Sequence, residues 1–224
     1  QKAIEVNQQS LAIAREIGDR TGESTSLDNL SRVYRSLGQY QQVIEGYERL
    51  LMIKRELGDT SGIVAVLNHL AKAYCFLERY QQAIDYHWQS LLMAQELSDR
   101  SAEAKTLSNL GNVCHLLGQY QQALEYHQQS LSIKRELGDQ AGVAVSLNKL
   151  GKACCSLGEY ERAIEYYQLS LAIAQELSDR SGEAHSLGGL GNAYYCLGQC
   201  QEATEYHRQS LKIVRELGEE LVLQ

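Results

Sequence analysis

Cysteine and histidine are the residue types in this chain best suited to nucleophilic, redox or metal chemistry. The 224-residue sequence contains six of each. Cys154 and Cys155 are adjacent in the stretch LGKACCSLGEY, residues 150–160. No two cysteines have the C-x-x-C spacing that is typical of redox pairs and many zinc sites. A thiol site would have to be assembled by the fold, so the elements that position these residues come next.

A forty-residue repeat runs through the chain without insertion. Aspartate recurs at 19, 59, 99, 139 and 179, and leucine recurs at 30, 70, 110, 150 and 190. Each repeat holds two apolar patterns of helical spacing, separated by a turn in which a glycine such as Gly118 suits the left-handed conformation that ends a helix. The aspartate that closes each repeat is a good N-cap for the next helix. The pattern predicts eleven helices, each of roughly 15–18 residues.

We expect these helices to form one domain over residues 1–217. A lone second helix over 1–17 precedes five helical pairs near 20–59, 60–99, 100–139, 140–179 and 180–217, and residues 218–224 form a C-terminal tail. The motif IKRELGD, at 53–59 and 133–139, alternates with AQELSDR, at 94–100 and 174–180. This alternation indicates that a unit of two helical pairs was itself duplicated. The missing initiator methionine indicates a piece of a longer protein.

The repeated motifs resemble the tetratricopeptide repeat, whose pattern is W-x2-L-G-x2-Y followed by A-x3-F. Here the corresponding residues are Leu187, Leu190, Gly191 and Tyr194, with Ala163-x3-Tyr167 in the preceding second helix. The forty-residue period is similar to the repeats of kinesin light chains, spindle-orientation adaptors and bacterial arrays. The resemblance implies an all-α, right-handed superhelical solenoid of antiparallel helix pairs. It also implies that the first helix of each pair lines a concave groove.

The repeat register separates the two adjacent cysteines. Cys154 shares its repeat position with Tyr74 and Tyr194, and we expect that position to lie in the core. Cys155 shares its repeat position with Arg35 and Tyr195, and we expect that position to face the groove. Small apolar packing is therefore the expected role of these thiols, with a redox or metal role as the alternative.

The histidines also follow the repeat rather than a metal site. His87, His127 and His207 occupy one repeat position, which holds tyrosine at 47 and 167. Spaced forty residues apart, they are expected on successive layers, where they cannot converge on one ion. No catalytic triad, H-E-x-x-H motif or phosphate-binding glycine loop is present. The sequence therefore predicts no enzyme activity, no cofactor and no metal.

Charge is divided unequally between the first helices and the rest of the chain. The net charge of −7 argues against binding nucleic acid or an anionic membrane. The predicted inner-face windows, 25–36, 65–76, 105–116, 145–156 and 185–196, hold six basic residues and only one acidic residue, Asp28. Lys72, Lys105 and Lys152 come from consecutive first helices, which predicts a positive ribbon about 20 Å long. Such a ribbon suits an acidic protein or peptide ligand, whereas a basic solvated face that binds nothing is the alternative.

Asparagines on the same helices extend the predicted site. In spindle-orientation adaptors an asparagine at the position of Asn112 and Asn192 holds the partner's backbone, so the resemblance implies that role here. Asn68 and Asn148, one turn earlier, could bond the amides of an extended segment. The predicted partner-binding residues are Arg32, Arg35, Asn68, Lys72, Lys105, Asn112, Asn148, Lys152, Asn192 and Tyr195.

The sequence thus predicts a protein–protein interaction module that binds a peptide or helical segment, acidic in character, in its groove. Two alternatives remain open: a sensor or autoinhibitory repeat arm of a larger signalling or effector protein, and an oligomeric scaffold. No signal segment and no apolar run of about 20 residues is present. With thiols that suit a reducing compartment, this favours a cytoplasmic location. Uncapped solenoid ends predict weak end-to-end self-association.

Overall fold

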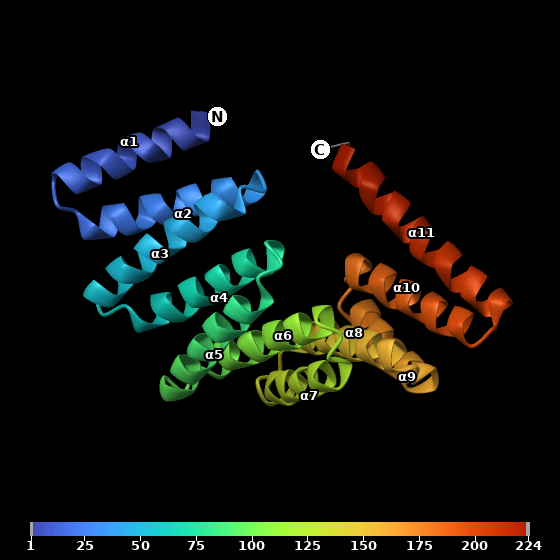
Figure 1. The fold of residues 1–224 in the computed structure, drawn as a ribbon. Coiled ribbons are helices and arrows are strands. Elements are labelled where there is room, and N and C mark those ends of the chain that lie inside the picture. Colours follow the sequence, from blue (N-terminus) through green and yellow to red (C-terminus); the bar gives the residue numbers. More distant parts are fainter. Residues whose placement is uncertain (1, 223–224) are drawn as a thin grey trace. The chain divides into compact units, whose positions relative to one another are not determined.

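The computed structural model is all-α (Figure 1). It describes the backbone of residues 2–222 and the side chains of residues 2–218, and within this range it has eleven helices and no strand. The first helices of the repeats are α2 (Arg20–Ser36), α4 (Thr60–Phe76), α6 (Arg100–Leu116), α8 (Gln140–Leu157) and α10 (Arg180–Cys196). The second helices are α1 (Lys2–Glu16), α3 (Tyr40–Glu56), α5 (Tyr80–Glu96), α7 (Tyr120–Glu136), α9 (Tyr160–Glu176) and α11 (Cys200–Val222). The predicted fold class is confirmed.

The described helices divide into two compact units. The first ends at Thr106 and the second begins at Leu107, so α6 contributes to both. In each unit, helices that follow one another in the chain pack side by side, α1 through α5 in the first and α7 through α11 in the second. The repeated leucine of each first helix lies in the core, since Leu70, Leu150 and Leu190 are completely buried.

Helix boundaries follow the predicted capping chemistry. The carboxylates of Asp19, Asp59 and Asp179 accept hydrogen bonds from the backbone N–H three residues later, which satisfies an otherwise free donor in the first turn. At the end of α8, Gly158 has φ 80°, the left-handed conformation expected there. The aspartate caps begin first helices, and left-handed residues, mostly glycine, end helices in the short turns.

The last helix is longer than predicted. α11 continues to Val222, so residues 218–222, predicted as a tail, are helical, and residues 223 and 224 lie outside the described residues. The repeat position that holds an aspartate N-cap at 59, 139 and 179 holds Glu219 here. Glutamate is a weaker N-cap than aspartate, so the sequence offers no new helix start at this point.

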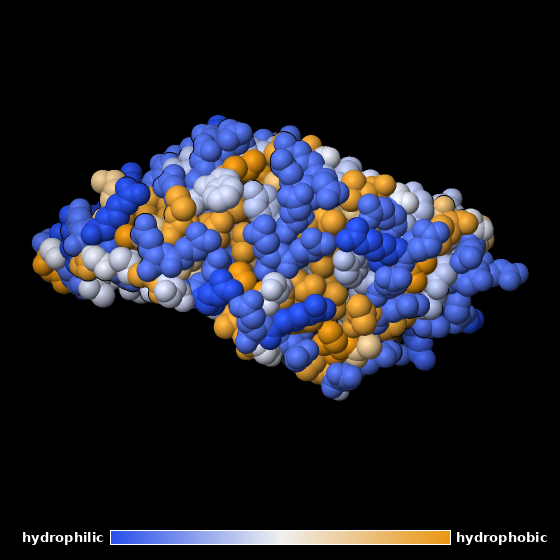
Figure 2. Space-filling view, turned by 90° about the horizontal axis from the view of Figure 1, so that it is seen from below, coloured by the Kyte–Doolittle hydropathy of each residue, from blue (hydrophilic) through white to orange (hydrophobic). Residues whose placement is uncertain are grey.

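Apolar side chains are also present on the surface. Figure 2 shows one face of the molecule on which polar side chains are interrupted by smaller apolar areas. Met52, Trp88 and Leu92, all on second helices, are between 42% and 62% exposed. Single exposed apolar residues are ordinary in folded proteins, and these carry no functional argument here.

Three turns place a residue other than glycine in the left-handed region. Glu78 has φ 58°, where Gly38, Gly118 and Gly198 stand in other repeats. We therefore expect Glu78→Gly to raise the free energy of unfolding by about 1 kcal/mol, which is a rise of roughly 2–4 °C in melting temperature. Thermal unfolding followed by circular dichroism checks this.

The reverse substitution provides the matched control. A Cβ at Gly118, which has φ 74°, would meet no heavy atom within 4 Å, so Gly118→Ala tests the backbone conformation alone. It should lower the melting temperature by a similar amount. An unchanged melting temperature in both variants would show that the left-handed turn costs nothing.

Candidate partner-binding site

The first unit gathers three cations from three first helices. Arg35 extends from α2, Lys72 from α4 and Lys105 from α6. Burial lowers the pKa of Lys72, and the positive charges of Lys105 and Arg35, which lie near Lys72, lower it further. None of the three side chains has a hydrogen bond or ion pair with a described residue. We name Arg35, Lys72 and Lys105 the basic cluster.

His69 lies beside the basic cluster and adds no charge to it. Its ring is half-buried and stacks on Tyr47 of α3, with ring centroids 5.2 Å apart. Burial lowers the pKa of His69 to about 4, and the nearby Arg35 and Lys72 charges contribute to the shift. The imidazole is therefore neutral near pH 7, and the cluster's charge comes from its lysines and arginine.

Arg32 differs from the other basic residues of this face. Its Nε lies 3.1 Å from a carboxylate oxygen of Asp28, one turn earlier on α2. The only acidic residue of the predicted inner face thus neutralises the outermost arginine. Among the basic residues on the first helices of this unit, Arg20 and Arg100 are also paired, so the unpaired positive charge of these helices is that of the basic cluster.

Asn68, predicted to bond a partner's backbone, has a different role. It is 5% exposed, and its Nδ2 donates to the hydroxyls of Ser90 (2.6 Å) and Thr106 (2.9 Å), which links α4 to α5 and α6. His87 Nδ1 lies 2.9 Å from Asn68 Oδ1; since an amide oxygen only accepts, the histidine donates. The prediction was wrong for Asn68, because this position of the first helix faces the core and not a partner.

The second unit repeats this arrangement eighty residues later. Asn148 is half-buried, and its Nδ2 donates to the hydroxyls of Ser170 (2.6 Å) and Ser186 (3.0 Å). Ser186 in turn donates to Ser170 at 3.1 Å. The amide nitrogen of Asn148 is therefore also used within the fold, and the bond to an extended segment's amides stays a prediction for this residue.

The remaining predicted residues of the second unit have side chains that are exposed or half-buried. Lys152, Asn192 and Tyr195 are exposed, Tyr195 to 67%, and Asn112 is half-buried. Lys149 is directed inward, where its Nζ donates to the Ser108 hydroxyl at 2.7 Å. The second unit thus presents an amide-rich and aromatic face with one exposed lysine.

The adjacent cysteines occupy the environments that their repeat positions predict. Cys154 is completely buried, and burial raises its pKa to about 11. Cys155 is half-buried, and burial also raises its pKa. Maleimide labelling of the native protein should modify Cys155 before Cys154, with mass spectrometry as the readout. Faster modification of Cys154 would contradict the assigned packing.

Two features of the site were not found from the sequence. His69 was not identified as a neighbour of the basic cluster, and the buried Asn68 network was not identified at all. A signal for the network was present, because Asn68, Ser90 and Thr106 are matched eighty residues later by asparagine, serine and serine. Polar residues that repeat together across three helices indicate a shared hydrogen-bond network.

Searches of the described residues for other kinds of site give negative results. Within residues 2–218, no group of three or more histidine, cysteine, aspartate or glutamate side chains could hold a metal ion. None of the helices in the described part of the chain combines the length and apolar character that a bilayer crossing requires.

Comparison with known proteins identifies the repeat. The tetratricopeptide-repeat family model matches residues 1–56, 62–136 and 142–216. No curated protein sequence matches the chain significantly.

Many solved structures share the fold, and three of them illustrate it. BtubC (BKLC) from P. vanneervenii is 21% identical with a TM-score of 0.84, over 97% of this chain and 91% of that chain. A variant of the kinesin light chain TPR-like repeats from Podosopora anserina is 24% identical, with a TM-score of 0.73 over 87% of this chain and 96% of that chain. A signal transduction ATPase with a tetratricopeptide repeat sensor, from Pyrococcus horikoshii, is 18% identical, with a TM-score of 0.81 over 96% of this chain and 34% of that chain. Because the family model covers most of the sequence, the chain belongs to the tetratricopeptide-repeat family.

Proposed function

We propose that the chain is a non-catalytic interaction module whose first unit binds an acidic segment of a partner protein. Tetratricopeptide repeats are protein-interaction modules, and the basic cluster is the observation that supports an acidic ligand. Three unpaired cations on neighbouring helices repel one another, and this repulsion adds to burial, the larger cause, in lowering the pKa of Lys72. Carboxylates placed between them would offset this repulsion.

For the second unit, taken by itself, we propose different contacts with a partner segment. Lys152 provides a further charge, and Asn112 and Asn192 provide side-chain amides suited to an extended backbone. Tyr195, being largely exposed, offers an aromatic surface for an apolar side chain of the ligand. Affinity should be modest and should fall as salt rises, because exposed ion pairs contribute only ~0.2–1 kcal/mol each and are screened.

A fluorescent peptide of alternating glutamate and serine tests this proposal. Fluorescence anisotropy should show binding at low ionic strength, weakening as sodium chloride is added. The same peptide with glutamine in place of glutamate is the matched control and should not bind. Equal binding of both peptides would rule out recognition by charge.

We also propose weak end-to-end association at high protein concentration. Val6 and Ile13 on α1 and Leu211 and Val214 on α11 are each more than half exposed. Their contact between two copies would bury apolar area at each junction. Sedimentation velocity should show a rising average mass towards millimolar protein, and a constant monomer mass over that range would contradict the prediction.

A further inference from the structure

The three cations of the basic cluster surround one ring, that of His69. The hydrogen bond from Asn68 to the Thr106 hydroxyl, 2.9 Å long, joins α4 to α6 beside the chain neighbours His69 and Lys105. Burial lowers the pKa of His69 to about 4, and the charges of all three members of the basic cluster lower it further. The three positive charges therefore converge on one place, which is half-buried at Lys72.

The acidic residues on the first helices of this unit do not neutralise the basic cluster. Glu23, Asp28 and Glu103 each form an ion pair with an arginine outside the cluster. Cys75 lies one turn after Lys72 on α4 and is half-buried. Because burial raises the pKa of Cys75 to about 11, this thiol is neutral near pH 7. A negative charge for the basic cluster would therefore have to come from a ligand.

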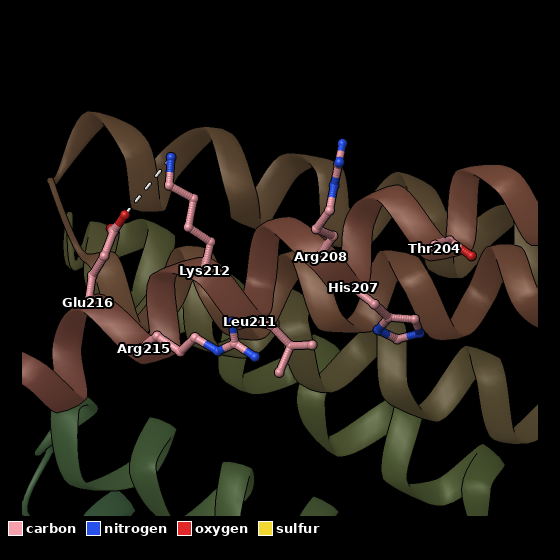
Figure 3. A pocket seen from close by; sticks show the side chains of 7 residues that line it. All are labelled: Thr204, His207, Arg208, Leu211, Lys212, Arg215 and Glu216. Carbon is pink, nitrogen blue, oxygen red and sulfur yellow. Dashed lines mark ion pairs between the residues drawn. The ribbon is translucent and has the colours of Figure 1, made fainter.

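A second group of basic residues, in the second unit, is mostly neutralised by nearby carboxylates. Arg208, Lys212 and Arg215 line a pocket along α11 (Figure 3). Arg208 pairs with Glu205, and the Nζ of Lys212 lies 4.0 Å from a carboxylate oxygen of Glu216. Arg215 has no ion pair with a residue whose side chain the structure describes. This group has one unpaired cation among the described side chains, whereas the basic cluster has three.

We propose that the basic cluster binds a phosphorylated serine or threonine within the partner's acidic segment, an inference that rests on the proposed function. A phosphate ester brings a charge of about −1.5 to −2 and three acceptor oxygens to one point, whereas a carboxylate brings a single charge. The planar guanidinium of Arg35 suits two phosphate oxygens, and Lys72 and Lys105 act as point charges. Because the three cations converge, one dianion offsets their repulsion better than one carboxylate does.

The histidines of the first unit do not change their charge between pH 7.5 and pH 5.5. Burial lowers the pKa of His69 to about 4 and that of His87 to about 3. The groups that face His69 are the three cations, Asp28 in its ion pair, and Tyr47, whose pKa burial raises to about 12. A phosphate ester takes up its second proton at a pKa of about 6. Loss of affinity over this interval would therefore report protonation of the ligand.

Two fluorescent peptides test this inference on the intact chain. Both are the glutamate–serine peptide, with its central serine either phosphorylated or replaced by glutamate. Fluorescence anisotropy at pH 7.5 should show about tenfold tighter binding of the phosphoserine peptide. At pH 5.5 this preference should fall about fourfold, because most of the phosphate then holds its second proton while glutamate stays ionised.

Arg35→Gln and Arg215→Gln are a matched pair, because each removes an exposed arginine that has no ion pair with a described side chain. Arg35→Gln should reduce the preference to about threefold or less, and Arg215→Gln should leave it unchanged. Equal losses in both variants would overturn the inference. So would equal binding of the two peptides, which would leave the proposed function standing, whereas failure of both peptides to bind would remove both. Tighter binding of a single-stranded oligonucleotide of the same charge would indicate a nucleic-acid ligand and would also overturn the inference.

Discussion

Replacing Asn68 by alanine should lower the free energy of unfolding by about 2–3 kcal/mol. The substitution removes the group that joins α4 to α5 and α6, and it leaves the buried His87 Nδ1 without its partner. His87 cannot compensate by charging, because burial lowers its pKa to about 3. Thermal unfolding should show a melting temperature roughly 5–10 °C lower.

Substitution of two further asparagines provides a comparison for the stability effect of Asn68→Ala. Asn148→Ala should be less costly, because Asn148 is only half-buried and no histidine depends on it. Asn29→Ala, at an exposed position of α2, should change stability by less than about 0.5 kcal/mol. If Asn68→Ala cost no more than Asn29→Ala, the buried network would have no stabilising role.

Reversing the charge of the basic cluster should abolish binding of an acidic ligand. In the triple variant Arg35→Glu, Lys72→Glu and Lys105→Glu, each change replaces an attraction by a repulsion. The affinity for the glutamate–serine peptide should fall by about tenfold or more. Because Arg35 and Lys105 are exposed and unpaired, circular dichroism should show unchanged helicity.

A second triple charge reversal, at other positions of the first unit, distinguishes the effect of the cluster from that of net charge. Arg49 and Arg55 are exposed residues of α3, and Arg79 is exposed in the turn before α5. Their reversal to glutamate changes the net charge by the same amount and should weaken binding far less. Equal losses in both triple variants would mean that overall charge, rather than the cluster, attracts the ligand.

The fold could be predicted from the sequence because each local signal agrees with the others. Aspartate caps, left-handed glycines and apolar spacing recur at fixed intervals, so an error in one repeat is corrected by the next. The prediction failed at residues 218–222, which were predicted as a tail but are helical. No strong capping residue ends the helix there. The same repetition predicted Cys154 in the core, where it is buried, and Cys155 facing the groove, and the structure leaves Cys155 half-buried.

The candidate site was predictable in part. The enrichment of basic residues on the first helices identified Lys72 and Lys105. An error of one residue in the predicted helix boundaries would not change that enrichment. Asn68 was misassigned because a polar side chain one turn away can be either exposed or buried, and sequence spacing alone does not decide which. The deciding fact is the presence of hydroxyl partners on two other helices, which only the packed structure brings together.

The most direct test of the proposed site observes the lysines themselves. Reductive ¹³C-methylation keeps the charge of all eight lysines and gives each an NMR signal whose titration reports its pKa. When the glutamate–serine peptide binds, the signals of Lys72 and Lys105 should shift, and the lowered pKa of Lys72 should rise as carboxylates offset the neighbouring charges. Lys54, already paired with Asp59, should not change. Shifts confined to lysines outside the basic cluster, such as Lys134 and Lys212, while the peptide is bound would contradict the account.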